Sequence, residues 1–266
     1  MQHVALLGYG AIGRAVSELV EARAAGQVEI IGALVRDPSR YAKEHERHGF
    51  PFVDGVEALL GLHPELVVEA GGHDAFRQHV PLILEAGVDV LSLSVGALAN
   101  PETLARTEAA AAAGGSRLRV PSGAIAALDA ISAAAVGHVD RVVHTVRKPP
   151  ATLIEGPRAA EIVAAGQPVE LYAGTAREAA LLFPANVNVI AAVSLAGIGL
   201  DRTEARILAD PAVSRNVHEV LVEGEFGRLF VRIENEPSEN PKTGRIVAMS
   251  VVRALRAYSE SIVVGG

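Results

Sequence analysis

Over residues 1–120, short apolar runs alternate with segments whose apolar residues recur at helical spacing. The short runs predict strands at Val4–Leu7, Glu29–Val35, Leu66–Glu69, Val88–Ser92 and Leu118–Val120. The segments between them predict helices, which include Ala11–Ala24, Val56–Leu60, Phe76–Ala86 and Pro101–Ala113. This alternation is typical of a doubly wound α/β fold, in which helices cover both faces of a parallel sheet. Ligands then bind beyond the carboxyl ends of the strands.

The pattern changes after Pro121-Ser122-Gly123. Helices are predicted at Ala124–Val136, Arg158–Ala165, Thr175–Phe183 and Asn188–Ala196, and strands at Val139–Arg147, Thr203–Ala209, His218–Glu223 and Arg228–Glu234. This mixture predicts a second α/β domain with a mixed sheet over residues 121–240. The last amphipathic segment, Lys242–Tyr258, predicts a helix that returns to the first domain, which then comprises residues 1–120 and 241–266.

The first strand runs directly into Gly8-Tyr9-Gly10-Ala11-Ile12-Gly13. A G-x-G-x-x-G motif between a strand and a helix indicates dinucleotide binding. Gly8 permits the tight turn, Gly10 lets the backbone approach a pyrophosphate, and Gly13 lets the helix pack close to the sheet. The free N–H groups at the helix N-terminus then favour the phosphates, so that Ala11 and Ile12 join the glycines as cofactor ligands. The alternative is an ordinary glycine-rich turn.

The end of the second strand carries both signals that distinguish the two nicotinamide coenzymes. An acidic residue there binds the ribose of NAD, whereas an arginine accommodates the extra phosphate of NADP. Asp37 is the acidic candidate, and Arg36 and Arg40 are the basic ones. We expect NAD as the cofactor, with NADP as an alternative. If neither signal operates, these three residues are solvated loop charges.

Composition narrows the class of protein. Half of the 266 residues are hydrophobic, which is enough for a substantial core. The net charge of -7 argues against nucleic-acid binding. The absence of cysteine excludes disulfides, thiolate zinc sites and a cysteine nucleophile, and no spacing of Asp and His predicts a metal site. The start lacks the basic segment of a signal peptide, and no apolar stretch is long enough to span a membrane. We therefore expect a cytoplasmic protein that has no membrane partner.

Candidate chemistry in the second half centres on His218, which begins a predicted strand just after Arg215 and Asn216. Imidazole titrates near neutrality, which suits proton transfer coupled to hydride transfer. The alternative is a half-buried histidine bonded to a backbone carbonyl. His73, which follows the third predicted strand, is a second histidine that could approach a cofactor.

Asn240-Pro241-Lys242-Thr243 precedes the last predicted helix. Backbone N–H groups, a hydroxyl and a lysine together would bind an anion. The alternative is a helix start with Thr243 as its N-cap and an exposed Lys242.

Several motifs occur in this order, and the combination resembles the L-aspartate dehydrogenase family (the NadX type). The motifs, besides the glycine turn, are Pro121-Ser122-Gly123-Ala124-Ile125, Asn186-Val187-Asn188, Ser194-Leu195-Ala196-Gly197, Ala209-Asp210-Pro211, Arg215-Asn216-Val217-His218, Phe226-Gly227 and Asn240-Pro241-Lys242-Thr243. The resemblance covers essentially the whole chain. Gly244 stands where the family usually has serine, and the order Arg36-Asp37 departs from the Asp-Arg of some members.

The resemblance implies a Rossmann domain followed by an α/β domain whose open sheet supports a homodimer. It implies that L-aspartate is oxidised to iminoaspartate, which water converts to oxaloacetate and ammonium, in a reversible reaction linked to NAD biosynthesis. His218 matches the family's catalytic histidine, and Ala124 and Asn188 match cofactor contacts. Asn240, Lys242 and Thr243 are candidates for one of the two substrate carboxylates, and Arg215 is a candidate for the other.

Two alternatives stay open at the level of sequence. One is another reductase of the same architecture, similar to dihydrodipicolinate reductase or homoserine dehydrogenase. The other is an NAD(H)-binding sensor without catalysis, although a sensor has no need of a base beside an anion site.

Overall fold

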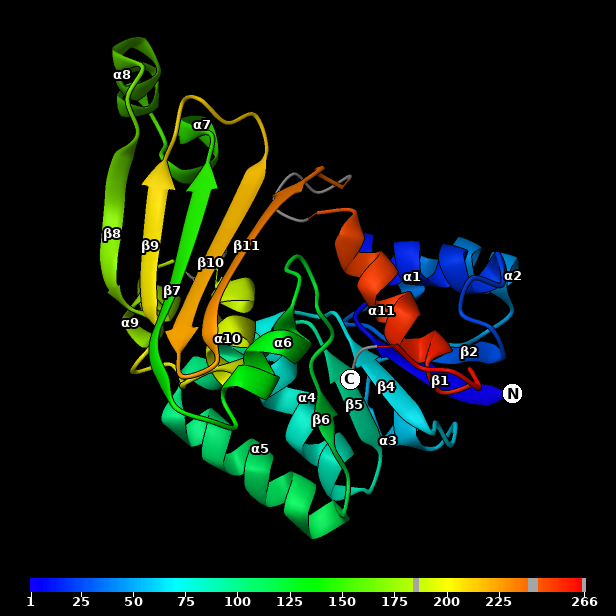
Figure 1. Ribbon diagram of the computed structural model, residues 1–266. Helices are drawn as coiled ribbons and strands as arrows, with labels where there is room; N and C mark the ends of the chain where they lie inside the picture. Colours follow the sequence, from blue (N-terminus) through cyan, green and yellow to red (C-terminus); the bar gives the residue numbers. More distant parts are fainter. Residues whose placement is uncertain (184–186, 239–243, 265–266) are drawn as a thin grey trace. The chain divides into compact units, whose positions relative to one another are not determined.

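The structure is a computed structural model that describes residues 1–183, 187–238 and 244–264 (Figure 1). The chain divides into two compact units. The first comprises residues 1–123 together with 247–264, and the second comprises residues 124–246. None of the helices in the described ranges is long and apolar enough to cross a membrane.

The first unit is built on a six-stranded parallel sheet with the strand order β3-β2-β1-β4-β5-β6. Its strands are β1 (Gln2–Leu7), β2 (Val28–Leu34), β3 (Phe52–Val53), β4 (Leu66–Glu69), β5 (Asp89–Ser92) and β6 (Leu118–Arg119). Its helices are α1 (Ala11–Glu21), η1 (Pro38–Tyr41), α2 (Ala42–His48), α3 (Val56–Leu60), α4 (His73–Glu85), η2 (Val95–Ala99), α5 (Pro101–Gly114) and α11 (Ile246–Arg256). The strand order reverses between β1 and β4, and a ligand crevice forms at such a switch point.

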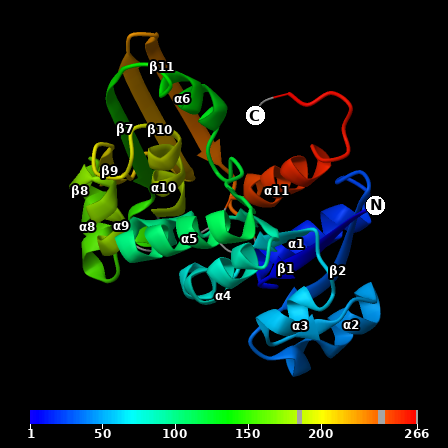
Figure 2. The same ribbon diagram turned by 90° about the horizontal axis from the view of Figure 1, so that it is seen from below.

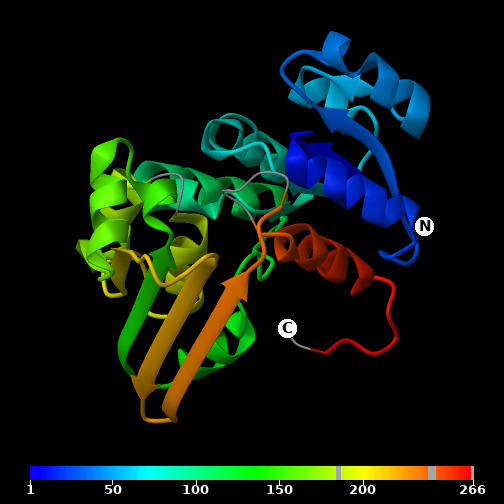
Figure 3. The same cartoon turned by 90° about the horizontal axis from the view of Figure 1, so that it is seen from above.

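Helix α11 belongs to this first unit although it follows the second unit in sequence. Its buried residues Ala248, Val251, Val252 and Leu255 join the core formed by β1, β2 and α1. Figure 3 shows α11, in red, beside α1, in blue. The core of the first unit therefore combines residues from the beginning and from the end of the sequence.

The second unit is built on a five-stranded mixed sheet with the strand order β11-β10-β7-β9-β8. The strands are β7 (Val139–Lys148), β8 (Val169–Thr175), β9 (Glu204–Ala209), β10 (Asn216–Gly224) and β11 (Gly227–Asn235). The helices are α6 (Leu128–Ala134), α7 (Pro150–Leu153), α8 (Pro157–Ala165), α9 (Ala176–Leu182) and α10 (Val187–Ala196). Strands β7 and β9 are parallel, and the other neighbours are antiparallel.

The two faces of this second sheet differ in character. One face packs against α6 and α10, where Val142, Val220 and Val222 meet Ile131 and Val193, and Figure 2 shows both helices on that side. The other face carries paired charges. Arg141 lies against Glu204, Arg147 and Arg232 against Glu219, and Arg206 against Glu170. Phe230 on the same face keeps 57% of its surface exposed.

Most of these elements lie within a few residues of the bounds that the hydrophobic pattern predicts. The helix expected from Ala124 begins later, at Leu128, because Ala127 adopts a left-handed backbone conformation (φ 63°) that starts the helix anew. Helix α11 begins at Ile246, and the expected start at Lys242 lies outside the described residues. Strands β3 and β8 and helices α2 and α7 had no counterpart in the prediction.

Candidate functional site

The glycine turn after β1 is closely packed on two sides. Gly8 has a φ of +97°, and a Cβ on it would lie 2.5 Å from the Cα of Gly71 in the loop after β4. A Cβ on Gly13 would lie 2.5 Å from the carbonyl oxygen of Gly8. Both positions therefore require glycine, one for the turn and one for the close approach of α1.

The start of α1 suits the phosphates of a dinucleotide. No side chain in the described ranges caps this helix, whose N-cap is Gly10, so the first-turn N–H groups of Ala11, Ile12 and Gly13 lack a side-chain acceptor there. A Cβ on Gly10 would meet nothing within 4 Å. An open N-terminus with room beside it fits a pyrophosphate, because free N–H groups and the helix dipole favour negative charge there.

A buried carboxylate shapes the neighbouring loop. Glu69 ends β4 with no exposed surface, and it accepts hydrogen bonds from the backbone N–H groups of Gly71 (2.9 Å) and Gly72 (3.1 Å). The hydroxyls of Ser92 (2.6 Å) and Ser94 (2.7 Å) also donate to it. These bonds fix the loop that packs on Gly8 and that leads to His73, the first residue of α4. From its place in the hydrophobic pattern, Glu69 is predicted only as a strand end.

An aromatic cluster packs around Tyr9, the second residue of the glycine turn. The ring of Tyr9 is buried and contacts Tyr41, His48, Phe50 and Phe52. Its hydroxyl shares a 2.8 Å hydrogen bond with Nε2 of His48, and burial raises the pKa of the Tyr9 phenol. The Tyr9 side chain therefore holds the glycine turn against the aromatic cluster.

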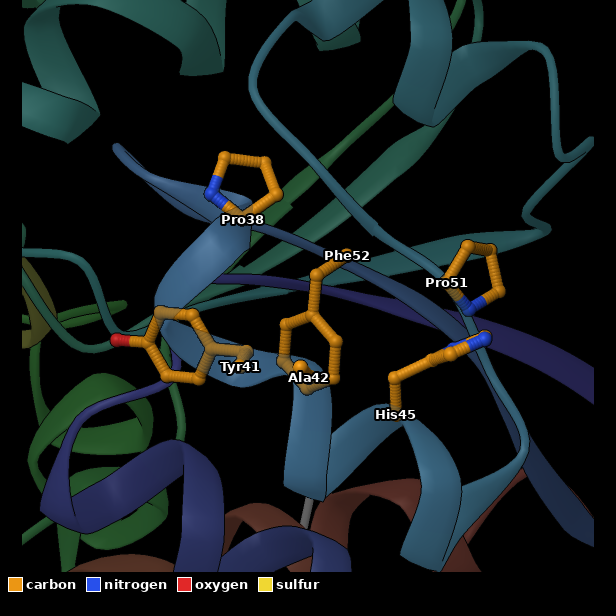
Figure 4. Close-up of a pocket in the computed structure, with 6 residues that line it drawn as sticks. All are labelled: Pro38, Tyr41, Ala42, His45, Pro51 and Phe52. Atoms are coloured by element: carbon orange, nitrogen blue, oxygen red, sulfur yellow. The ribbon is translucent and has the colours of Figure 1, made fainter.

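A pocket of about 300 Å³ lies on the outer side of this cluster. Its lining consists of Pro38, Tyr41, Ala42, His45, Pro51 and Phe52. In Figure 4 the rings of Tyr41 and Phe52 lie side by side, and their centroids are 4.9 Å apart. The pocket is mainly apolar, and no charged side chain lines it apart from the titratable ring of His45.

The residues after β2 take distinct roles. Asp37 is the N-cap of η1, and its Oδ1 accepts hydrogen bonds from both the N–H (3.1 Å) and the hydroxyl (2.5 Å) of Ser39. Arg36 and Arg40 are exposed, and neither forms an ion pair with another described residue. The two arginines are therefore available to a phosphate, whereas Asp37 already holds the turn.

In the second unit, His218 lies near the start of β10 on the helix-covered sheet face and is only 5% exposed. Its Nδ1 is 3.1 Å from Nε2 of His144, which lies on the neighbouring strand β7 and is fully buried. Burial lowers the pKa of His144 to about 3. The pKa of His218 also lies well below its ordinary value, first because of burial and then because of His144 and the charge of Lys148.

This lowered pKa differs from the near-neutral titration expected of His218 from sequence. Its cause is tertiary, because a strand pattern does not reveal how deeply the ring is covered. At neutral pH both imidazoles are therefore uncharged.

Lys148 is a further polar residue of this face that no sequence motif singles out. It is the last residue of β7 and only 5% exposed. Alternation along β7 puts its side chain on the same face as His144. A buried ammonium group can form a charge-assisted hydrogen bond with a carboxylate.

The remaining candidates of the second unit are spread over several elements. Ala124 precedes α6, and its carbonyl accepts a 2.9 Å hydrogen bond from the buried amide of Asn235 at the end of β11. Asn188 is exposed in the first turn of α10. Arg215 is ion-paired with Glu236. Asn240, Lys242 and Thr243 lie outside the described residues.

The described side chains offer no cluster of three or more His, Asp or Glu residues that could hold a metal ion.

Two family models match the chain. One is described as the NAD binding domain of homoserine dehydrogenase and matches residues 8–121. The other is described as the C-terminal domain of aspartate dehydrogenase and matches residues 129–258. The two matches meet the expectation of a Rossmann domain followed by a second α/β domain.

Similar proteins include two full-length relatives. L-aspartate dehydrogenase of Ralstonia pickettii is 41% identical over 271 residues, covering 98% of this chain and 100% of the relative. L-aspartate dehydrogenase of Ruegeria pomeroyi is 43% identical, covering 97% of this chain and 93% of the relative.

Two solved structures are also similar. Aspartate dehydrogenase from Thermotoga maritima matches with a TM-score of 0.78 and 25% identity over the whole of both chains. A homoserine dehydrogenase from Thiobacillus denitrificans matches with a TM-score of 0.61 and 16% identity, over 97% of this chain and 74% of that one, which shows a shared fold.

Proposed function

The chain belongs to the L-aspartate dehydrogenase family, and we propose which of its residues carry out the reaction. It is an NAD(P)-dependent enzyme that oxidises L-aspartate to iminoaspartate, which water converts to oxaloacetate and ammonium. The same full-length similarity does not favour a reductase of another substrate class or a non-catalytic sensor. The roles that follow rest on the geometry of the two units.

The coenzyme is held by the first unit in this proposal. Gly8, Gly10 and Gly13 shape the turn, and the uncapped N–H groups of Ala11 and Ile12 face the pyrophosphate. Arg36 and Asp37 meet the adenosine ribose, and Ala124 and Asn188 of the second unit contact the nicotinamide end. When bound, the oxidised nicotinamide supplies the acceptor for a hydride.

His218 handles the proton, and this is the assignment on which the proposal depends. The amine of aspartate must be uncharged before its lone pair can assist loss of the hydride, so a base has to take the ammonium proton or later activate water. His218 is uncharged at neutral pH because burial and Lys148 lower its pKa. A bound dicarboxylate offsets the charge of Lys148 and thereby brings the pKa of His218 back toward the working pH.

The two carboxylates of aspartate require cationic or N–H donors. We assign one carboxylate to Lys148, whose buried ammonium lies on the same sheet face as His218. Asn240, Lys242 and Thr243 remain the candidates for the other carboxylate. Arg215, which already pairs with Glu236, is the weaker candidate. Fixing both carboxylates presents Cα to the nicotinamide in one orientation. Such orientation supplies a large part of an enzyme's rate enhancement.

We further propose that the enzyme is a homodimer whose subunits pack through the charged face of the five-stranded sheet. Phe230, 57% exposed, and Leu221 lie opposite each other on neighbouring strands of this face. An exposed aromatic side chain on a sheet face that none of the unit's described helices packs against is typical of an interface.

The proposal is tested by following NADH oxidation with oxaloacetate and ammonium in wild type, His218→Ala and Lys148→Met. We expect wild-type oxidation to require both substrates. His218→Ala should lower kcat by about 100-fold or more, since general acid–base catalysis contributes about that much. Lys148→Met should raise KM for oxaloacetate about tenfold, as expected for the loss of one charged hydrogen bond.

NADH affinity, measured by fluorescence, should stay within about twofold in both variants, because neither residue touches the coenzyme in this assignment. His138→Ala is the matched control, since His138 is an exposed histidine of the same unit. A loss below about threefold in His218→Ala rules out His218 as the proton carrier. Oxidation without ammonium would instead identify a keto-acid reductase.

A further inference from the structure

His144 has no role in the function proposed above, yet its contact with His218 is direct. In the register of β7 and β10, Val146 lies opposite His218, and His144 lies opposite Val220. His144 and His218 are therefore diagonal neighbours on the helix-covered face. Their ring centroids are 5.3 Å apart, and one hydrogen bond of 3.1 Å joins Nε2 of His144 to Nδ1 of His218.

The surroundings of the pair are unequal at its two ends. Nδ1 of His144 is buried and has no hydrogen-bond partner in the described part of the chain. Nδ1 of His218 already faces His144, so Nε2 is the ring nitrogen that the proposed function assigns to the substrate.

The pair has two neutral tautomers, and they differ in what His218 presents at Nε2. If His144 donates, His218 keeps its own proton on Nε2 and cannot accept another there. If His218 donates from Nδ1, its Nε2 carries a lone pair. The unpartnered Nδ1 of His144 is an N–H when His218 donates and a lone pair when His144 donates, and it loses hydration in both cases.

The charge of Lys148 decides between the two tautomers. His144 and Lys148 lie on either side of Val146 along β7, so they flank His218 from opposite directions. Nδ1 of His218 points toward His144, and Nε2 lies on the other side of the ring. The charge of Lys148 acts on His218, and a positive charge favours the tautomer whose nearer ring nitrogen carries a lone pair over an N–H.

We propose that His144 is a positioning residue that accepts the Nδ1–H of His218 and so keeps the Nε2 lone pair ready for the substrate proton. This inference rests on the proposed function of His218. In the proton-transfer step the N–H bond of the substrate ammonium breaks and an Nε2–H bond forms. The positive charge moves to His218, whose Nδ1–H stays bonded to His144.

His144 suits this role because it does not take the proton itself. Its burial keeps it uncharged down to about pH 3. The groups facing His218 from the neighbouring strands are His144, Val146 and Lys148 of β7 and Ile233 of β11. The charged Arg147 and Glu219 point to the opposite face, where they pair with each other.

The first test reads the tautomer directly. Nitrogen-15 spectra of the histidine-labelled full-length enzyme distinguish Nδ1–H from Nε2–H, and His144→Gln and His218→Ala assign the two signals. We expect His218 to carry its proton on Nδ1. An Nε2-protonated His218 in the free enzyme would overturn the proposal.

The second test measures kinetics in two variants of His144. His144→Phe keeps a ring but no acceptor, and we expect kcat to fall about tenfold while KM for NADH stays within about twofold. His144→Gln offers a carbonyl oxygen near the place of Nε2, so kcat should return to within about threefold of wild type. The rescue separates positioning from mere packing.

Val142→Ala is the matched control, because Val142 is buried on the same face of the same strand. It should lower thermal stability and leave kcat per folded enzyme unchanged. If His144→Phe keeps wild-type kcat, or if Gln fails to rescue it, the positioning role is wrong. If His218→Ala itself keeps its activity, the proposed function is what fails, and the spectra still report on the pair.

Discussion

At the residue scale, coenzyme choice depends on how each charged side chain after β2 is already occupied. Asp37 holds Ser39 through two hydrogen bonds to one carboxylate oxygen. Arg36 and Arg40 have no ion-pair partner within the described ranges. An unpaired guanidinium binds a phosphate through strong charge-assisted hydrogen bonds. The geometry thus favours acceptance of NADP beside NAD.

Arg36→Ala should raise KM for NADPH about tenfold, since one lost bond to a charged group is worth about 1.5–3 kcal/mol. KM for NADH should stay within about twofold, because NADH lacks the extra phosphate. Initial rates with oxaloacetate and ammonium at varied coenzyme concentration measure both values. Arg117→Ala, an exposed arginine at the other end of the sheet, is the control. Equal effects on both coenzymes would contradict a phosphate contact.

At the scale of elements, β7 and β10 bury two histidines side by side, and this couples stability to pH. Both pKa values lie below the value of about 6.5 that histidine has in an unfolded chain. Below that pH the unfolded chain binds protons that the folded strands exclude. The stabilisation is therefore complete above about pH 6.5 and is lost as the pH falls toward the folded-state pKa, about 3 for His144.

His144→Gln should accordingly flatten the pH dependence of unfolding. Each histidine kept neutral costs up to about 1.4 kcal/mol per pH unit below its unfolded pKa. Between about pH 6.5 and 4.5, the variant should lose about 2 kcal/mol less stability than wild type. Urea unfolding at several pH values measures this slope. His138→Gln, which replaces an exposed histidine, should keep the wild-type slope, and parallel curves for His144→Gln and wild type would refute the argument.

At the scale of the whole molecule, the proposed dimer depends on the sheet face that carries Phe230. Burying an aromatic side chain in an interface contributes about 1.5–3 kcal/mol, whereas burying an unpaired carboxylate there is strongly unfavourable. The ion pairs around Phe230 leave no cation to which a new carboxylate could bind without breaking one of them. The face should therefore tolerate aromatic substitutions and reject acidic ones.

Phe230→Glu should convert the dimer to a monomer of 27.7 kDa, as measured by light scattering coupled to size exclusion. Phe226→Glu is the matched control, because Phe226 is a similarly exposed phenylalanine at the turn between β10 and β11. It should leave the mass at the dimer value. A wild-type enzyme that already runs as a monomer would disprove the dimer, and a dimeric Phe230→Glu would place the interface elsewhere.

The sequence by itself determined the features that depend on local patterns. The apolar runs predicted β1, β4, β5 and β10, and the glycine spacing predicted the cofactor turn. Both signals are local, because side-chain alternation and the need for a positive φ depend on neighbouring residues. The combination of motifs determined the family. Strand β8 was missed because it is an edge strand with no residue fully buried, so its hydrophobic pattern is weak.

Only the tertiary structure decided what depends on residues that lie far apart in the chain. It brought His144 to His218 across 74 positions, placed Lys148 on the same face, and gave Glu69 its partners Ser92 and Ser94. It also lowered the pKa of His218, which the imidazole alone would set near neutrality. The physical reason is that burial, hydrogen-bond partners and electrostatic fields are set by strand pairing and packing, and no single segment of sequence contains them.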